Sequence, residues 1–198
     1  MSGLMDLLQS TIKDSSIGEI SRQLGQDERT TSNAIDSALP MLIGALTKST
    51  AADNGEGLQR ALETKHDGSI LDDVAGFVKN NDQSDGRGIL GHILGRNGGA
   101  AAMLLGEQSG IGESNATSLM ATLAPVVLGA LGKAKSQKNL GANQLTSMLA
   151  SESDSLAQRT PGMMRAVSGL LDQDGDGDTD LADLLKVGKS GLGSLLRR

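Results

Sequence analysis

One nine-residue pattern occurs twice in this 198-residue chain, as PMLIGALTK at residues 40–48 and as PVVLGALGK at residues 125–133. The match extends without gaps to 25 aligned positions at an offset of 85, of which seven are identical. Pro40 and Pro125 occupy the same place in both copies. Proline inside a helix removes a hydrogen bond, so each copy is expected to be a kinked helix or two helices, the second beginning at the proline. We expect the two copies to be the most buried part of the protein.

Helical periodicity also dominates outside the repeat. Ser16 and Glu19 form a capping-box pattern, which predicts the start of a second helix. The 27 glycines lie largely between helical runs and indicate many short helices. The predicted fold class is all-α, a repeat-built multi-helix bundle. The first helix is predicted from apolar residues on one face: Leu4, Leu7, Leu8 and Ile12.

Three regions follow from this pattern. We expect residues 1–160 to form a helical body with two related halves, about 1–80 and 98–160. Residues 161–198 are expected to form an EF-hand-like helix–loop–helix. Between the halves, residues 80–99 are rich in Asn, Asp, Gly and Ser, which predicts a linker containing one small helix.

The composition excludes several kinds of site. The chain has no cysteine, which excludes disulfides, thiolate zinc sites and cysteine nucleophiles. Phe77 is the only aromatic residue, which disfavours base-stacking platforms for single-stranded nucleic acid. With 24 acidic and 18 basic residues, the net charge of −6 argues against general binding to phosphate backbones.

No run of apolar residues is long enough to predict a transmembrane helix. The first residues lack the basic start and apolar run of a secretory signal. A cytoplasmic location is therefore the default expectation, and export by a route that needs no such signal stays open.

Four segments carry a resemblance to a known family: residues 39–46, 66–73, 88–95 and 123–131. In these segments the chain resembles the YidB-like family of bacterial proteins of unknown function, and the resemblance covers most of residues 1–170. It implies an α-helical bacterial protein. It supplies no activity and no catalytic residues.

The acidic excess is concentrated in one segment, DQDGDGDTDLAD at residues 172–183. This segment holds six of the 24 acidic residues and no base, so the rest of the chain has 24 − 6 = 18 acids against 18 bases. Calcium takes six to eight oxygen ligands, and an EF-hand loop supplies them from positions 1, 3, 5, 7, 9 and 12, with glycine at position 6. In this register Gly177 falls at the turn. The predicted ligands of one Ca²⁺ are Asp172, Asp174, Asp176, Asp178 through its backbone carbonyl, Asp180 directly or through water, and Asp183.

Two positions depart from the usual EF-hand. Asp183 closes the loop where Glu is commoner, as in the calcium loops of dockerin modules, which this segment resembles. Thr179 stands where an aliphatic β-branched residue usually pairs with a second loop, so the site is expected to be single. Magnesium is disfavoured because it demands stricter octahedral geometry. Apolar stripes on both sides of the segment predict the flanking helices.

A second candidate function comes from the segment Arg22–Asn33. The order of its elements, two helical runs separated by Gly25, is typical of a DNA-binding helix-turn-helix. Glu28 and Asp36 lie on the proposed reading helix, and two helices with a turn also occur in any helical bundle. DNA binding is therefore the lesser alternative.

His66 and His92 are 26 residues apart, and no nucleophile or carboxylate can be assigned to them from the sequence. Each is interpreted as a loop or helix-surface residue rather than a catalytic base.

These observations predict a non-enzymatic, calcium-binding structural or protein-interaction protein. Calcium is expected to order the C-terminal helix pair, and a protein partner or self-association into a homo-oligomer is expected. Nucleic acid is not an expected partner.

Overall fold

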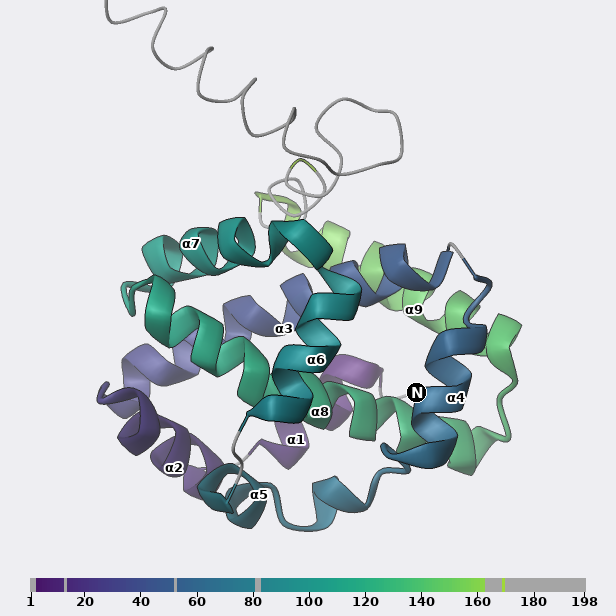
Figure 1. The fold of residues 1–198 in the computed structure, drawn as a ribbon, viewed down its shortest axis with the longest axis horizontal. Helices are drawn as coiled ribbons and strands as arrows, with labels where there is room; N and C mark the ends of the chain where they lie inside the picture. The colour runs from purple at the N-terminus through teal and green to yellow at the C-terminus, as the bar shows by residue number, and fades with distance from the viewer. Residues whose placement is uncertain (1–2, 13, 52, 81–82, 163–168, 170–198) are drawn as a thin grey trace, which may run out of the picture.

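The computed structural model describes residues 3–12, 14–51, 53–80, 83–162 and 169, and the described part of the chain contains helices and no strands. The prediction of an all-α fold is therefore confirmed. The helices are α1 (Leu4–Thr11), α2 (Asp14–Leu24), α3 (Glu28–Ala51), α4 (Glu56–Thr64), α5 (Val74–Asn80), α6 (Ser84–Ile93), α7 (Gly98–Ser109), α8 (Glu113–Lys138) and α9 (Ala142–Arg159), with short 3₁₀ turns at Ser69–Asp72 and Gly95–Asn97 (Figure 1).

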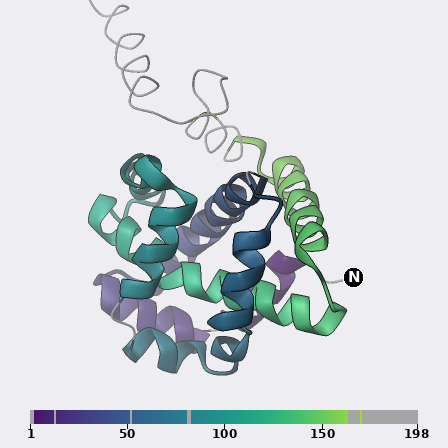
Figure 2. The same cartoon turned by 45° about the vertical axis from the view of Figure 1, so that its right-hand side comes forward.

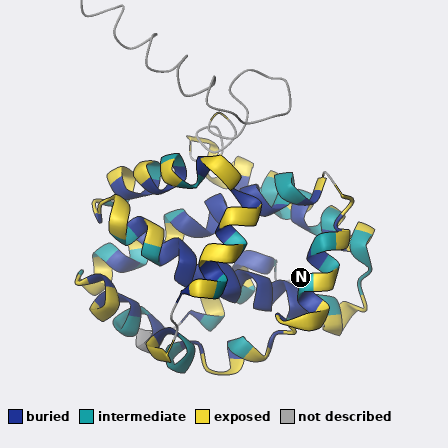
Figure 3. Cartoon of the chain, viewed as in Figure 1, coloured by how far each residue is buried: buried dark blue, intermediate teal, exposed yellow. Residues whose placement is uncertain are grey.

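Helices α3 and α8 contain the two copies of the repeated pattern and form the centre of the molecule. Residues 38–46 of α3 and 119–132 of α8 are buried without interruption. A helix that is apolar on every side needs neighbours all around it. The other helices provide them, with their exposed residues facing outward (Figure 3).

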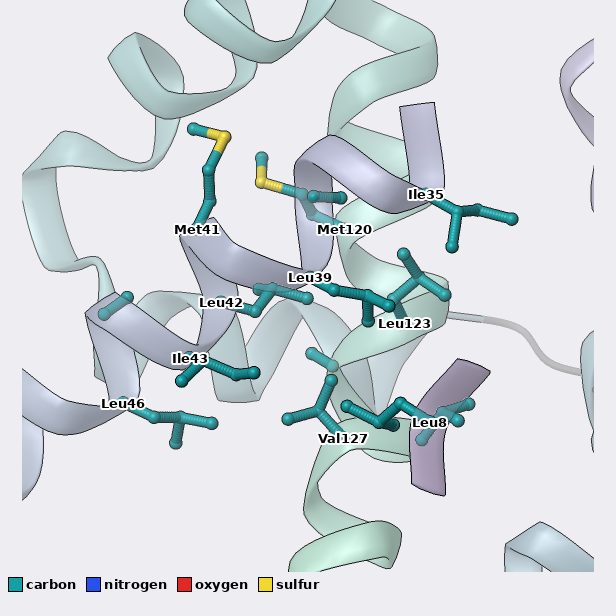
Figure 4. Packing of buried hydrophobic residues seen from close by; sticks show 14 of the residues in the cluster. Leu8, Ile35, Leu39, Met41, Leu42, Ile43, Leu46, Met120, Leu123 and Val127 are labelled. Atoms are coloured by element: carbon teal, nitrogen blue, oxygen red, sulfur yellow. The ribbon is translucent and has the colours of Figure 1, made fainter. Parts of the chain in front are cut away.

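The two long helices pack on each other, and α8 also packs on α1. In Figure 4, Leu39 and Met41 of α3 lie beside Leu123 and Met120 of α8, and Leu8 of α1 lies near Val127. All of these side chains are at most 3 % exposed. This core holds the three helices together.

Both helices run through their prolines without ending. Pro40 lies inside α3 and Pro125 inside α8, so the alternative of two helices meeting at each proline is wrong. The two helices begin at Glu28 and Glu113, which are the same 85 residues apart as the prolines. The division of the body into two related halves, about 1–80 and 98–160, stays a prediction.

Two local predictions are wrong. The small helix expected between the halves is present as α6, but the expectation of a linker is wrong, because α6 packs on α8 through the buried residues Leu90 and Ile93. Because these two residues contact the core, the surrounding Gly and Asn residues do not make a loose connection. Helix α2 begins at Asp14 rather than after a cap at Ser16, which lies inside the helix and is buried.

Helix α9 closes one side of the molecule. It runs beside α3 (Figure 2) and also contacts α4. Leu145, Leu149 and Leu156 are its buried residues. The chain continues from α9 toward the acidic segment.

By length and composition alone, α8 could cross a membrane, with a mean hydropathy of 1.4 over 18 residues. In the structure 83 % of that window is buried. Packing in the centre of the fold accounts for the apolar character of α8.

Candidate functional site in a cavity between α4 and α6

A cavity of about 680 Å³ lies between α4 and α6, over α3 and α8. Its volume falls within the usual range of small-molecule sites, about 300–1,000 Å³. The four helices that contribute to its lining, α3, α4, α6 and α8, are labelled in Figure 1. Its lining combines apolar residues with charged and histidine side chains: Leu46, Ser49, Thr50, Asp53, Gly57, Leu58, Arg60, Ala61, Lys65, His66, Ser84, Asp85, Gly88, Ile89, His92, Ile93 and Leu128.

His66 is held in place by close contacts between its loop and α8. The loop follows α4, and its Gly68 adopts a φ of +106°, a conformation that favours glycine. Gly132 of α8 lies directly against the carbonyl oxygen of His66, where a Cβ atom would overlap it. Gly129, one turn earlier, lies in the same way against Ile70. The loop can therefore approach α8 only because these positions lack side chains.

His66, Lys65 and Asp85 form a charged cluster at the cavity wall. Asp85 lies at the N-terminal end of α6, with its carboxylate 3.6 Å from His66 Nε2 and 3.8 Å from Lys65 Nζ. Burial lowers the pKa of His66 below its ordinary value, Asp85 opposes that change, and Lys65 adds to it. His66 is therefore neutral at pH 7.

A second hollow of about 340 Å³ lies on the other side of this cluster. Phe77 and Pro125 line it together with Lys65, His66 and Asp85. The three polar residues thus separate two cavities.

The opposite wall is built around the start of α4. Asp53 accepts hydrogen bonds from the backbone N–H groups of Gly55 (3.0 Å) and Gly57 (2.7 Å). The hydrogen bond from Gly57 contributes most to lowering the pKa of Asp53 below its usual value. The bond from Gly55 and the nearby Arg60 guanidinium lower this pKa further. Asp53 therefore fixes the first turn of α4, and its carboxylate accepts hydrogen bonds from two backbone N–H groups.

The structure brings together two histidines that the sequence left unconnected. His92 is exposed on α6 and lines the same cavity as His66, which is 7 % exposed and not a surface residue. The interpretation of His66 as a loop residue is right, but the loop is buried against α8. Only the packing of α4 and α6 on α8 shows that the two histidines share a site. No sequence pattern indicated it, because the 26-residue separation matches no local spacing.

The predicted calcium ligands lie outside the described residues: Asp172, Asp174, Asp176, Asp178, Asp180 and Asp183. Within the part of the chain that the structure describes, no group of three or more His, Asp or Glu side chains could hold a metal ion. The calcium site stays a prediction from the sequence.

The helix-turn-helix candidate is formed by α2, the turn at Gly25 (φ +63°) and the start of α3. Arg22 pairs with Glu19 of its own helix at 2.9 Å. Arg29 and Asn33 are exposed on α3. The same exposed surface of α3 carries Glu28 and Asp36, so its net charge does not favour DNA.

In the comparison with protein families, residues 6–134 match the family described as a bacterial protein of unknown function (DUF937). The chain belongs to this family. No curated protein and no solved structure matches the chain.

The family region includes the whole cavity. It extends from α1 to most of α8, and every residue lining the 680 Å³ cavity lies within it. The acidic segment 172–183 follows this region. The cavity-lining residues thus lie within the residues that match the family, and the predicted calcium loop lies beyond them.

Proposed function

We propose that this protein is a non-enzymatic, calcium-binding structural or protein-interaction protein. The observation that carries the proposal is the spacing of six aspartates in residues 172–183, which supplies the oxygen ligands of an EF-hand loop in one register. Starting the loop at Asp174 instead would place Thr179 at the glycine position and Leu185 at the closing position. Only the register that begins at Asp172 satisfies both positions.

Calcium binding would act on the end of the chain that follows α9. Six carboxylates within twelve residues repel one another, and a divalent cation removes that repulsion. Apolar residues on both sides of the segment, such as Leu171 and Leu184, would then be held as a helix pair. This pair would present an apolar surface to a partner protein or to a second copy of the chain.

The test is calorimetric titration of the full chain with Ca²⁺, together with its melting temperature in calcium and in chelator. We expect one Ca²⁺ per chain and a higher melting temperature in calcium, since a ligand that binds only the native state stabilises it by RT ln(1 + [L]/Kd). Asp172→Ala should remove both effects.

Asp154→Ala is the matched control, because it also removes one carboxylate, from an exposed position on α9. It should bind calcium as the wild type does. Absence of binding heat in the wild type would refute the site. The solution mass with and without calcium tests self-association.

The second candidate is a nucleic-acid-binding regulator that uses Arg22–Asn33. The turn at Gly25 between α2 and α3 favours it, and the acidic residues beside Arg29 count against it. DNA binding at low salt that weakens steeply as salt rises would support this function. No retention on DNA at low salt would remove it.

Within the DUF937 family, the closer assignment to YidB-like proteins rests on the four sequence segments described above. It carries no activity with it.

A further inference from the structure

The cavity between α4 and α6 has an apolar floor that no described side chain fills. Leu46 of α3, Leu128 of α8 and Ile93 of α6 line it from below and are buried in the core. A cavity that combines an apolar surface with a few polar groups is the usual form of a small-molecule site. Its occupant would bury an aliphatic or aromatic body against this floor.

The charges at the rim indicate the polar end of such an occupant. Both acidic groups already have partners: two backbone N–H groups donate to Asp53, and the Lys65 ammonium lies 3.8 Å from Asp85. A cationic ligand would have to compete with these partners for either carboxylate.

Arg60, on the α4 side of the cavity, is a donor that could bind a negatively charged group. The Arg60 side chain makes one hydrogen bond, from Nε to the carbonyl oxygen of Glu56 at 3.4 Å, and has no ion pair within 4 Å among the described residues. A guanidinium carries five N–H donors and suits a carboxylate in bidentate geometry. His92, on the α6 side of the cavity, offers a further nitrogen.

We propose that this cavity binds a small amphipathic carboxylate, with the carboxylate on Arg60 and the apolar body over Leu46, Ile93 and Leu128. This site is independent of the proposed calcium loop and lies within the family region. Binding here needs no calcium.

Gly88 provides a way to close the cavity without disturbing the fold. It lines the cavity from α6, and a Cβ atom added there would meet nothing within 4 Å. Replacing an interior helical glycine with leucine also improves helix propensity. Gly88→Leu should therefore fold and fill the space that the ligand needs.

Gly91→Leu is the matched control. Gly91 lies on the same helix, is exposed, has open space around its Cα and does not line the cavity. A second pair tests the charge. Arg60→Gln removes the guanidinium at the rim, and Arg29→Gln removes an exposed guanidinium on α3 outside the cavity.

The probes are octanoate, n-octylammonium and acetate, titrated calorimetrically into the full chain in chelator, with helicity and melting temperature recorded for each variant. We expect octanoate to bind at one per chain, at least about tenfold more tightly than the other two probes. Gly88→Leu and Arg60→Gln should each weaken octanoate binding by about tenfold or more. Gly91→Leu and Arg29→Gln should leave it unchanged.

Three results would overturn the proposal: no octanoate binding by the wild type, equal binding by folded Gly88→Leu and Gly91→Leu, or equal affinity for octanoate and n-octylammonium. Because these titrations contain no calcium, their failure leaves the calcium proposal standing, and failure of the calcium titration leaves the cavity proposal standing.

Discussion

The position of His66 depends on a glycine in the neighbouring helix α8, because a side chain there would overlap the His66 backbone. Its carbonyl oxygen lies against Gly132, and its imidazole is buried within 3.6 Å of the Asp85 carboxylate. Burial disfavours the charged imidazole more than Asp85 favours it, so its pKa is lowered. The residue therefore makes stability depend on pH.

The first prediction concerns that dependence. The unfolded chain protonates His66 near its ordinary pKa of 6.5, while the folded chain resists protonation. Below that pH the unfolded state binds more protons, so the contribution of His66 is complete above about pH 6.5 and is lost as the pH falls through the lowered pKa. His66→Gln should therefore show a smaller decrease in the free energy of unfolding between about pH 7.5 and about pH 5.

Urea denaturation at pH steps measures this difference. An unchanged slope in His66→Gln would show that other groups cause the pH dependence.

At the scale of elements, the packing of α6 on α8 depends on a proline and a glycine together. Pro125 has no N–H group, so the carbonyl of Ala121, four residues earlier, lacks its helical donor. Gly86, in the first turn of α6, lies against that carbonyl oxygen. The place where α8 loses a hydrogen bond is thus a place where the backbone of α6 lies close against α8.

The second prediction follows from this contact. A Cβ atom at Gly86 would overlap the Ala121 carbonyl oxygen, and neither backbone can move without shifting a helix. Gly86→Ala should lower the free energy of unfolding by about 1–3 kcal/mol, as overpacking does.

Gly91→Ala is its control, because Gly91 has open space on the same helix. That substitution should raise the free energy of unfolding by about 0.5–1 kcal/mol. Denaturant curves give the free energy of unfolding of both variants. Equal changes in Gly86→Ala and Gly91→Ala would contradict the close contact between Gly86 and Ala121.

At the scale of the whole molecule, the two ends of the described chain are joined by one side chain. Gly3 at the start of α1 offers no capping side chain. Glu152 of α9 accepts hydrogen bonds from the backbone N–H groups of Leu4 and Met5, each at 3.2 Å. A carboxylate at a helix N-terminus also interacts favourably with the helix dipole. Glu152 therefore caps a helix 148 residues away in the sequence.

The third prediction is that Glu152→Ala lowers the free energy of unfolding by about 1–2 kcal/mol, the usual cost of losing a helix cap. Glu152→Gln keeps an acceptor oxygen without the charge and should lie between wild type and Glu152→Ala. Asp154→Ala, from an exposed position two residues along α9, should have little effect. Chemical denaturation measures all three, and equal stability of Glu152→Ala and Asp154→Ala would contradict the capping role.

Much of the fold could be predicted because helix formation depends on local residue order. The periodic apolar residues of α1 and the repeated pattern in α3 and α8 identify helices and their buried positions. The predicted start of α2 was wrong because Ser16 lies buried inside the helix instead of capping its N-terminus. The candidate cavity could not be predicted, because its lining comes from four helices and two loops whose contacts join distant residues.

The sequence by itself determined the all-α class and the central place of the two proline-containing segments, and the register of the calcium loop stays a prediction from the sequence. Each of these depends on spacing within a few turns of one segment. Only the tertiary structure decided that α6 belongs to the core, that Glu152 caps α1, and that His66, His92 and Arg60 surround one cavity. The physical reason is that these contacts require glycines and carboxylates from distant segments to meet, and close packing, not local periodicity, selects which segments meet.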